Sequence, residues 1–155
     1  MSSEHSVPKP RSIAEEAVHN FVEDSFNCAE AVVEAVGRSE GLASRALTPI
    51  AAAFGGGIGS LGHICGALSG GLMMLGRRAT ARGLARPEIR ARAQELYQRF
   101  ERTFGAVDCR TLTDHDCNAA GGYAYDIRNC AKYIRLATEA VLELSAPAAA
   151  TEKAG

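Results

Sequence analysis

This 155-residue chain lacks a large net charge of one sign, a long hydrophobic run and an apolar N-terminal signal. Its 17 basic and 18 acidic residues nearly balance, so no net field attracts nucleic acid or anionic lipid. Its longest apolar stretch, residues 64–75, is interrupted by glycines and is shorter than the roughly 18 to 20 residues that a membrane span requires. Residues 1–12 contain no apolar core that could act as a secretion signal. We therefore expect a cytoplasmic protein without a transmembrane segment.

Aromatic side chains are also scarce where a nucleic-acid site would need them. The one dense basic stretch has arginines at positions 77, 78, 82, 86, 90 and 92, with few aromatics among them for base stacking. Acidic residues elsewhere in the chain balance this charge. We interpret the arginines as a solvated helix face and predict no nucleic-acid partner.

Glycine, in contrast, is abundant in residues 54–76, "FGGGIGSLGHICGALSGGLMMLG". Gly57, Gly59 and Gly62 spell G-x-G-x-x-G, the pattern of a dinucleotide-binding loop. A dinucleotide loop follows a β-branched strand and precedes an acidic ribose ligand, but the segment before these glycines is helix-like and no acid occurs before Glu88. We therefore do not expect NAD to bind.

The apolar residues recur with a helical period almost everywhere, which predicts an all-α fold. We expect a compact bundle of about five to six helices with a glycine-rich loop and a cysteine-bearing loop at about 105–117. The termini, 1–10 and 146–155, are predicted to be disordered, and 11–145 to form a single domain. The predicted helices cover approximately 12–24, 28–36, 43–54, 64–75, 87–104 and 127–144.

Five cysteines are many for a chain expected in a reducing compartment, where structural disulfides are disfavoured. Cys28 follows the predicted N-cap Asn27, where helix amides would lower its pKa, and its helical spacing directs it inward. Cys65 lies near the next helix start beyond the glycines. Gly66 and Gly70, four residues apart, remove side chains from one stripe of that helix and would let a neighbouring backbone approach.

The remaining cysteines differ in their surroundings. Cys130 is predicted to point inward near the start of the last helix. Arg110 follows Cys109 directly and would favour its thiolate, while Cys117 looks exposed. No cysteine pair is spaced as C-x-x-C, so neither a zinc knuckle nor a thioredoxin-like motif is predicted. The inward cysteines could converge as a cage for iron–sulfur or zinc, or as two redox pairs, and His63 could be a ligand or a proton donor.

Four segments together resemble the C_GCAxxG_C_C family of redox-active proteins. They are "NCAEAVV" around Cys28, "FGGGIG" leading into "CGALSGGLMMLG" at Cys65, "FGAVDCRTL" at Cys109 and "CAKYIRLATEA" at Cys130. The resemblance spans about residues 12–144. It implies a small helical protein with these four motif cysteines, to which Cys117 is an addition. The family also resembles part of the split-Soret cytochromes, which implies a cysteine-bound iron–sulfur centre, but covalent haem is not expected because no C-x-x-C-H is present.

Three functions follow as hypotheses. The first is electron transfer through an iron–sulfur centre held by the four motif cysteines, with Gly57, Gly59, Gly66 and His63 around it. The second is thiol–disulfide exchange, in which Cys28 or Cys65 attacks and a neighbouring cysteine resolves. The third is a metal-holding or sensing module without turnover. Each would involve a redox partner or ligand that the sequence does not identify, and a homodimer stays an open alternative.

Overall fold

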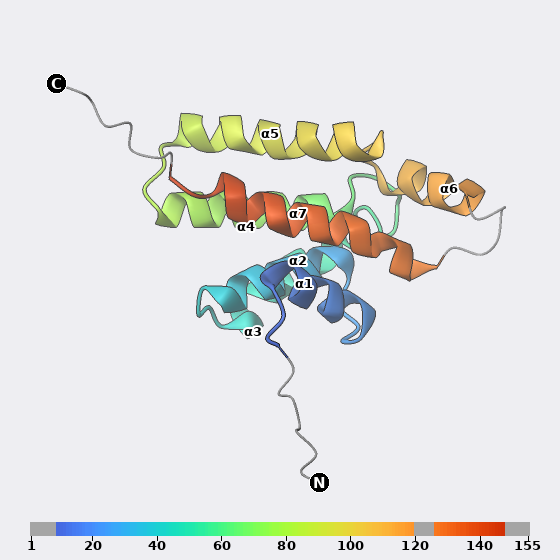
Figure 1. Ribbon diagram of the computed structural model, residues 1–155, viewed down its shortest axis with the longest axis horizontal. Helices are drawn as coiled ribbons and strands as arrows, with labels where there is room; N and C mark the ends of the chain where they lie inside the picture. Colours follow the sequence, from blue (N-terminus) through green and yellow to red (C-terminus); the bar gives the residue numbers. More distant parts are fainter. Residues whose placement is uncertain (1–8, 120–125, 148–155) are drawn as a thin grey trace, which may run out of the picture.

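The computed structural model describes residues 9–119 and 126–147, and these form an all-α bundle, as the helical periodicity predicts (Figure 1). The elements are α1 Ile13–Val22, α2 Cys28–Ser39, α3 Ser44–Leu47, a 3₁₀ helix η1 Thr48–Phe54, α4 Gly66–Ala81, α5 Arg86–Phe104, α6 Cys109–Ala119, a 3₁₀ turn η2 Ile127–Cys130 and α7 Ala131–Leu144. The only β-type pairing among the described residues is an isolated bridge between Ile64 and Asp108. No described helix has both the length and the apolar content to cross a bilayer.

Local sequence signals fix where the first helices begin. Ser12 accepts a hydrogen bond from the amide of Glu15, and the Glu15 carboxylate accepts one from the amide of Ser12, which completes a capping box at α1. Asn27 accepts a hydrogen bond from the amide of Glu30 and caps α2, which places Cys28 at its first position.

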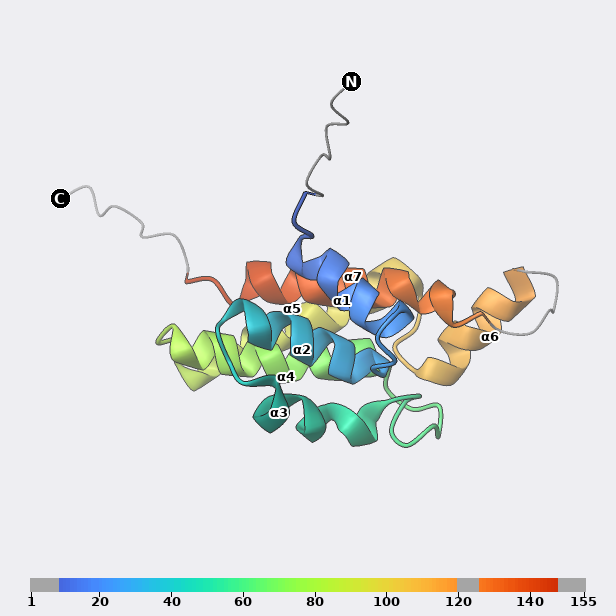
Figure 2. The same cartoon turned by 90° about the horizontal axis from the view of Figure 1, so that it is seen from below.

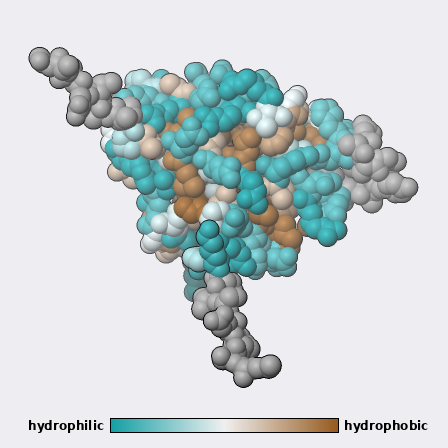
Figure 3. Space-filling view, viewed as in Figure 1, coloured by the Kyte–Doolittle hydropathy of each residue, from teal (hydrophilic) through white to brown (hydrophobic). Residues whose placement is uncertain are grey.

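Helices α2 and α4 run side by side in the same direction at the centre of the bundle, with α1 and α7 packed beside them (Figures 1 and 2). The close approach depends on the predicted glycine stripe, because a Cβ on Gly70 would lie 2.7 Å from the carbonyl oxygen of Ala29 on α2. At the N-terminal ends of the two helices, Gly66 faces Cys28. Hydrophilic residues cover most of the face in Figure 3, with hydrophobic residues visible between them.

The structure corrects three expected elements. The predicted helix at 43–54 is a short α-helix followed by η1, because Pro49 near the start of η1 has no backbone N–H to donate. The helix predicted at 64–75 begins at Gly66 and continues to Ala81. Residues 109–117, predicted as a loop, belong to α6, because Asp108 accepts a hydrogen bond from the amide of Thr111 and caps the helix.

The interpretation of the arginine stretch as a solvated face is wrong for Arg78, which is only 8% exposed and donates to Glu40 and Ser145. Residues 1–8 and 148–155, which fall within the termini predicted to be disordered, lie outside the described residues.

Candidate functional site

The four motif cysteines, drawn from distant parts of the chain, line one small cavity. Cys28, Cys65, Cys109 and Cys130 share it with apolar and hydroxyl-bearing neighbours, namely Gly66, Ala67, Leu112, Thr113 and Tyr133. The cavity has a volume of about 20 Å³, which is room for about one water molecule. The structure thus brings the thiols together around a common, nearly apolar space.

Each of these cysteines stands at the N-terminus of a helix. Cys28 is the first residue of α2, and Cys109 is the first residue of α6. Cys65 is the N-cap of α4, and Cys130 is the N-cap of α7. The helix ends meet on the right-hand side of Figure 1. Because each helix N-terminus carries a partial positive charge of about one half, this arrangement favours negative charge in the cavity.

Two glycines let backbone lie directly against these cysteines. A Cβ on Gly66 would lie 2.3 Å from Cys28 Sγ and 3.0 Å from the carbonyl oxygen of Phe54. A Cβ on Gly57 would lie 2.7 Å from the Cβ of Cys109 and 2.5 Å from the carbonyl oxygen of His63. Any side chain at either position would displace a cysteine or the backbone that holds it.

The glycine-rich loop has left-handed backbone throughout its turn. Residues 56–60 all have positive φ, including Ile58 at 62° and Ser60 at 64°. Positive φ is an outlier for a β-branched residue such as Ile58, so this loop holds strain that its surroundings must sustain. The backbone hydrogen bonds that hold the loop include His63 N–H to Gly57 O at 2.9 Å, Cys109 N–H to His63 O at 2.6 Å, and Cys65 N–H to Val107 O at 2.7 Å. The loop is thereby fastened to two of the cysteine-bearing segments.

Burial opposes ionisation of the Cys65 and Cys109 thiols. Cys65 is 6% exposed, and burial, with a smaller effect of Cys28, raises its pKa to about 12, although the amides of Leu68 and Ala67 act in the opposite direction. The pKa of Cys109 is also raised, by burial first and then by Cys28 and Asp108. The expectation that Arg110 would favour a Cys109 thiolate is therefore wrong. The Arg110 guanidinium donates instead to the carbonyl oxygen of Leu61.

The other predicted site residues do not all reach the cavity. Gly66 lines it and Gly57 adjoins Cys109, but Gly59 has nothing within 4 Å of where a Cβ would be. The His63 side chain is exposed and does not line the cavity, so His63 contributes through its backbone. Cys117 lies within α6, and its side chain is outside the described part of the structure.

The sequence analysis missed Tyr133 as a member of the site. The Tyr133 ring lies in the cavity wall and packs edge-on against Phe104, with ring centroids 4.7 Å apart. Its hydroxyl donates to Asp116 at 2.7 Å, and Lys132 makes an ion pair with the same carboxylate. Burial raises the pKa of Tyr133, so the phenol stays protonated at neutral pH. The helical spacing of three residues from Cys130 was the available signal.

Thr113 and Leu112 were missed for a different reason, because the segment that carries them was predicted to be a loop. Recognition of Asp108 as an N-cap would have placed both residues one turn after Cys109, on the cysteine-bearing side of α6.

The site is not arranged as a ready-made metal centre in the described residues. Within 9–119 and 126–147, no group of three or more histidine, cysteine, aspartate or glutamate side chains is spaced to hold a metal ion. Cys28, Cys65 and Cys109 are in no disulfide. The cavity therefore offers soft sulfur donors close together, in an apolar space smaller than a polynuclear centre would need.

Comparison with known proteins gives one match. The family described as "putative redox-active protein (C_GCAxxG_C_C)" matches residues 26–144, most of the chain and all four cysteine-bearing segments. No curated protein and no solved structure matches. On the strength of the family match, this chain belongs to the C_GCAxxG_C_C family of redox-active proteins.

Proposed function

We propose that this redox-active protein transfers electrons through an iron–sulfur centre held by Cys28, Cys65, Cys109 and Cys130. The observation that carries the proposal is the convergence of four helix N-termini, each supplying one cysteine, on a single cavity. Thiolate ligands are negatively charged, and an iron–sulfur core together with four thiolates is anionic as a whole, so helix N-termini would stabilise it. A fold that needed buried cysteine only as a small apolar residue would not require this placement.

The acid–base properties of Cys65 support a ligand role over a nucleophilic one. A thiol with a pKa of about 12 is protonated at neutral pH, and the thiol form is a poor nucleophile. Metal binding displaces the thiol proton and forms a bond that compensates for burial, so a buried cysteine can still be a ligand. The amides of Ala67 and Leu68 then remain to stabilise the charge on the sulfur.

The donor set fits an iron–sulfur centre, which would supply one-electron transfer. The cysteine cavity is too small for such a centre in this conformation, because about 20 Å³ accommodates only one water molecule. Binding therefore requires the cysteine-bearing helix ends to separate. The segment before Cys65 is a loop rather than a helix, and it is held to the start of α6 by only a few backbone hydrogen bonds. This is where we expect the movement.

A second function, thiol–disulfide exchange, is favoured by that same small volume. A disulfide needs no room for a metal, and Cys28 influences the pKa of both Cys65 and Cys109. In this reaction two thiols would form one S–S bond, release two protons, and give two electrons to a disulfide of the partner, which is reduced to two thiols.

Anaerobic purification of the full chain separates the two functions. An iron–sulfur protein has visible absorption and contains iron and sulfide, and Cys65→Ser should lose all three because serine is a poor ligand for a soft metal. Cys117→Ser is the matched control, since this cysteine lies outside the family motif. A colourless, metal-free protein whose Cys65→Ser variant accumulates a mixed disulfide with a thiol partner would establish exchange instead.

A further inference from the structure

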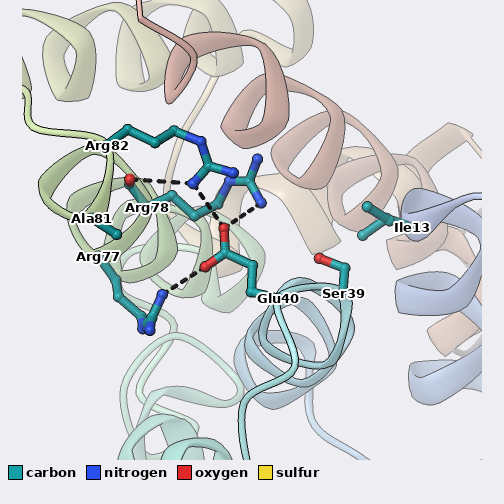
Figure 4. A pocket seen from close by; sticks show the side chains of 7 residues that line it. All are labelled: Ile13, Ser39, Glu40, Arg77, Arg78, Ala81 and Arg82. Atoms are coloured by element: carbon teal, nitrogen blue, oxygen red, sulfur yellow. Dashed lines mark hydrogen bonds and ion pairs between the residues drawn. The ribbon is translucent and has the colours of Figure 1, made fainter.

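The opposite end of α2 and α4 carries a second group of converging side chains, shown in Figure 4. Arg77 and Arg78 near the C-terminal end of α4, and Arg82 at its C-cap, point toward one carboxylate, that of Glu40 just beyond α2. Their Nη1 atoms lie 2.6, 2.7 and 2.8 Å from the Glu40 oxygens. Arg78 is twelve positions after Gly66 on α4, so this group lies about 18 Å along the helix from the cysteine cavity.

The charges in this group do not balance. Three guanidinium groups face one carboxylate, and no other acidic residue within 9–119 and 126–147 lines the pocket they share. A carboxylate that only anchored α4 to α2 would need a single arginine. Adding two more brings like charges together, and Arg77 and Arg82 indeed lower the pKa of Arg78, after the larger effect of burial. Contact between α2 and α4 therefore does not account for the two additional arginines, which leave the pocket with excess positive charge.

The geometry of the guanidinium groups leaves donors for another acceptor. Each arginine uses Nη1 for Glu40, and Arg78 also uses Nε to donate to Ser145 at 2.8 Å. Among the residues that the structure describes, none accepts a hydrogen bond from Nη2 of these guanidinium groups, so these donors remain for a ligand. Arg78 is held rigidly, with its side chain 10% exposed, while Arg77 and Arg82 are about one-third exposed at the pocket rim. The paired N–H donors of arginine guanidinium groups have the geometry to hydrogen-bond with the oxygens of a phosphate group.

The size of the pocket suits a small molecule. Its volume is about 550 Å³, within the range of small-molecule sites, and Ile13 and Ala81 supply apolar wall beside the arginines. Ser39 adds a hydroxyl oxygen. In the part of the chain that the structure describes, no aromatic side chain lines the pocket, so none of these residues would stack on a nucleobase.

We propose that this pocket binds a dianionic phosphate group, either as inorganic phosphate or as the phosphomonoester of a small non-aromatic molecule. Glu40 acts as the internal counter-ion, which holds the three arginines in place and competes with the ligand for them. The site is independent of the cysteine cavity, and its test does not depend on any metal being bound there.

Calorimetric titration of the full chain with inorganic phosphate and with glycerol phosphate, at constant ionic strength in chloride, tests the proposal. We expect saturable binding that Arg77→Gln weakens by roughly tenfold or more, the effect of losing one charge-assisted hydrogen bond. Arg90→Gln is the charge-matched control, because this exposed arginine on α5 does not line the pocket, and it should leave binding unchanged. Tighter binding of the ester would identify an organic phosphate as the ligand, and equal affinities would identify the free anion.

Glu40→Gln provides a second, opposite test. If the carboxylate competes with the ligand, the variant should bind phosphate more tightly than the wild-type protein, and phosphate should raise its melting temperature more. Absence of saturable binding by either phosphate compound would overturn the proposal. So would equal loss of binding in Arg77→Gln and Arg90→Gln, because that would show only general charge attraction.

Discussion

Replacement of Gly66 by alanine tests whether the closeness of α4 to Cys28 holds the cysteine site together. The added methyl would lie 2.3 Å from Cys28 Sγ, whereas non-bonded atoms need about 3.5 Å, so the sulfur must move by more than about 1 Å. The methyl would also lie 3.0 Å from the carbonyl oxygen of Phe54 and 3.2 Å from the amide nitrogen of Ala29, and these backbone atoms limit any retreat of α4.

The magnitude follows from two opposing contributions. Overpacking in a tight interior destabilises by about 1–3 kcal/mol. Alanine in place of glycine stabilises a helix by up to about 1 kcal/mol, less at its first position. We therefore expect Gly66→Ala to lower the free energy of unfolding by about 1–2 kcal/mol. It should also move Cys28 away from the other three motif cysteines and reduce metal loading.

Gly76→Ala is the matched control on the same helix, because a Cβ there would meet nothing within 4 Å. It should stabilise the protein by about 0.5–1 kcal/mol. Urea denaturation of the reduced, metal-free protein measures both variants, with unchanged m-values indicating the same unfolding transition. If Gly66→Ala is as stable as Gly76→Ala and keeps full metal loading, then the contact between Gly66 and Cys28 does not order the site.

Three further outcomes follow from the geometry. In the metal-free protein at pH 8, iodoacetamide should modify Cys28 well before Cys65, because Cys65 is buried and its pKa is about 12; peptide mapping that finds equal rates would contradict the burial argument. Asp108→Ala should lower the free energy of unfolding by about 1 kcal/mol through loss of the α6 cap. Hydrogen bonds depress the folded-state pKa of Asp108, so this contribution is present above the unfolded value of about 3.9 and is lost as the pH falls through the folded value. A difference from wild type that does not shrink as the solution is acidified would refute it. Tyr133→Phe should lower the free energy of unfolding by about 1 kcal/mol through loss of the hydrogen bond to Asp116. It should not change the iron content that the proposed function predicts, and a lower content would show that the phenol itself is needed.

The sequence predicts the fold well because most helices have local signals, namely capping residues at their starts and a helical apolar period. The capping residues Ser12 and Asn27 lie where the structure has helix starts, and the apolar period of α7 shows which residues point inward. The prediction failed at α6, whose polar composition resembles a loop and whose start depends on one aspartate.

The candidate site was only partly predictable, because local spacing does not say which helix ends meet. An inward direction could be predicted for Cys28 from its helix, but its contact with Gly66 depends on the parallel packing of α2 and α4. Burial also reverses a local expectation at Cys109, whose neighbouring arginine turns away to Leu61. The same limit applies to Arg78, which is on a basic stretch in sequence but is buried by contacts with residues far along the chain.

The central claim, that four cysteines at four helix N-termini together hold an iron–sulfur centre, is tested most directly by metal and sulfide content. Iron, zinc and acid-labile sulfide should be measured on a single sample of the wild-type protein purified without oxygen. The proposed function predicts iron and sulfide in comparable amounts with little zinc. A protein with zinc and no sulfide, or with no metal at all, would contradict it.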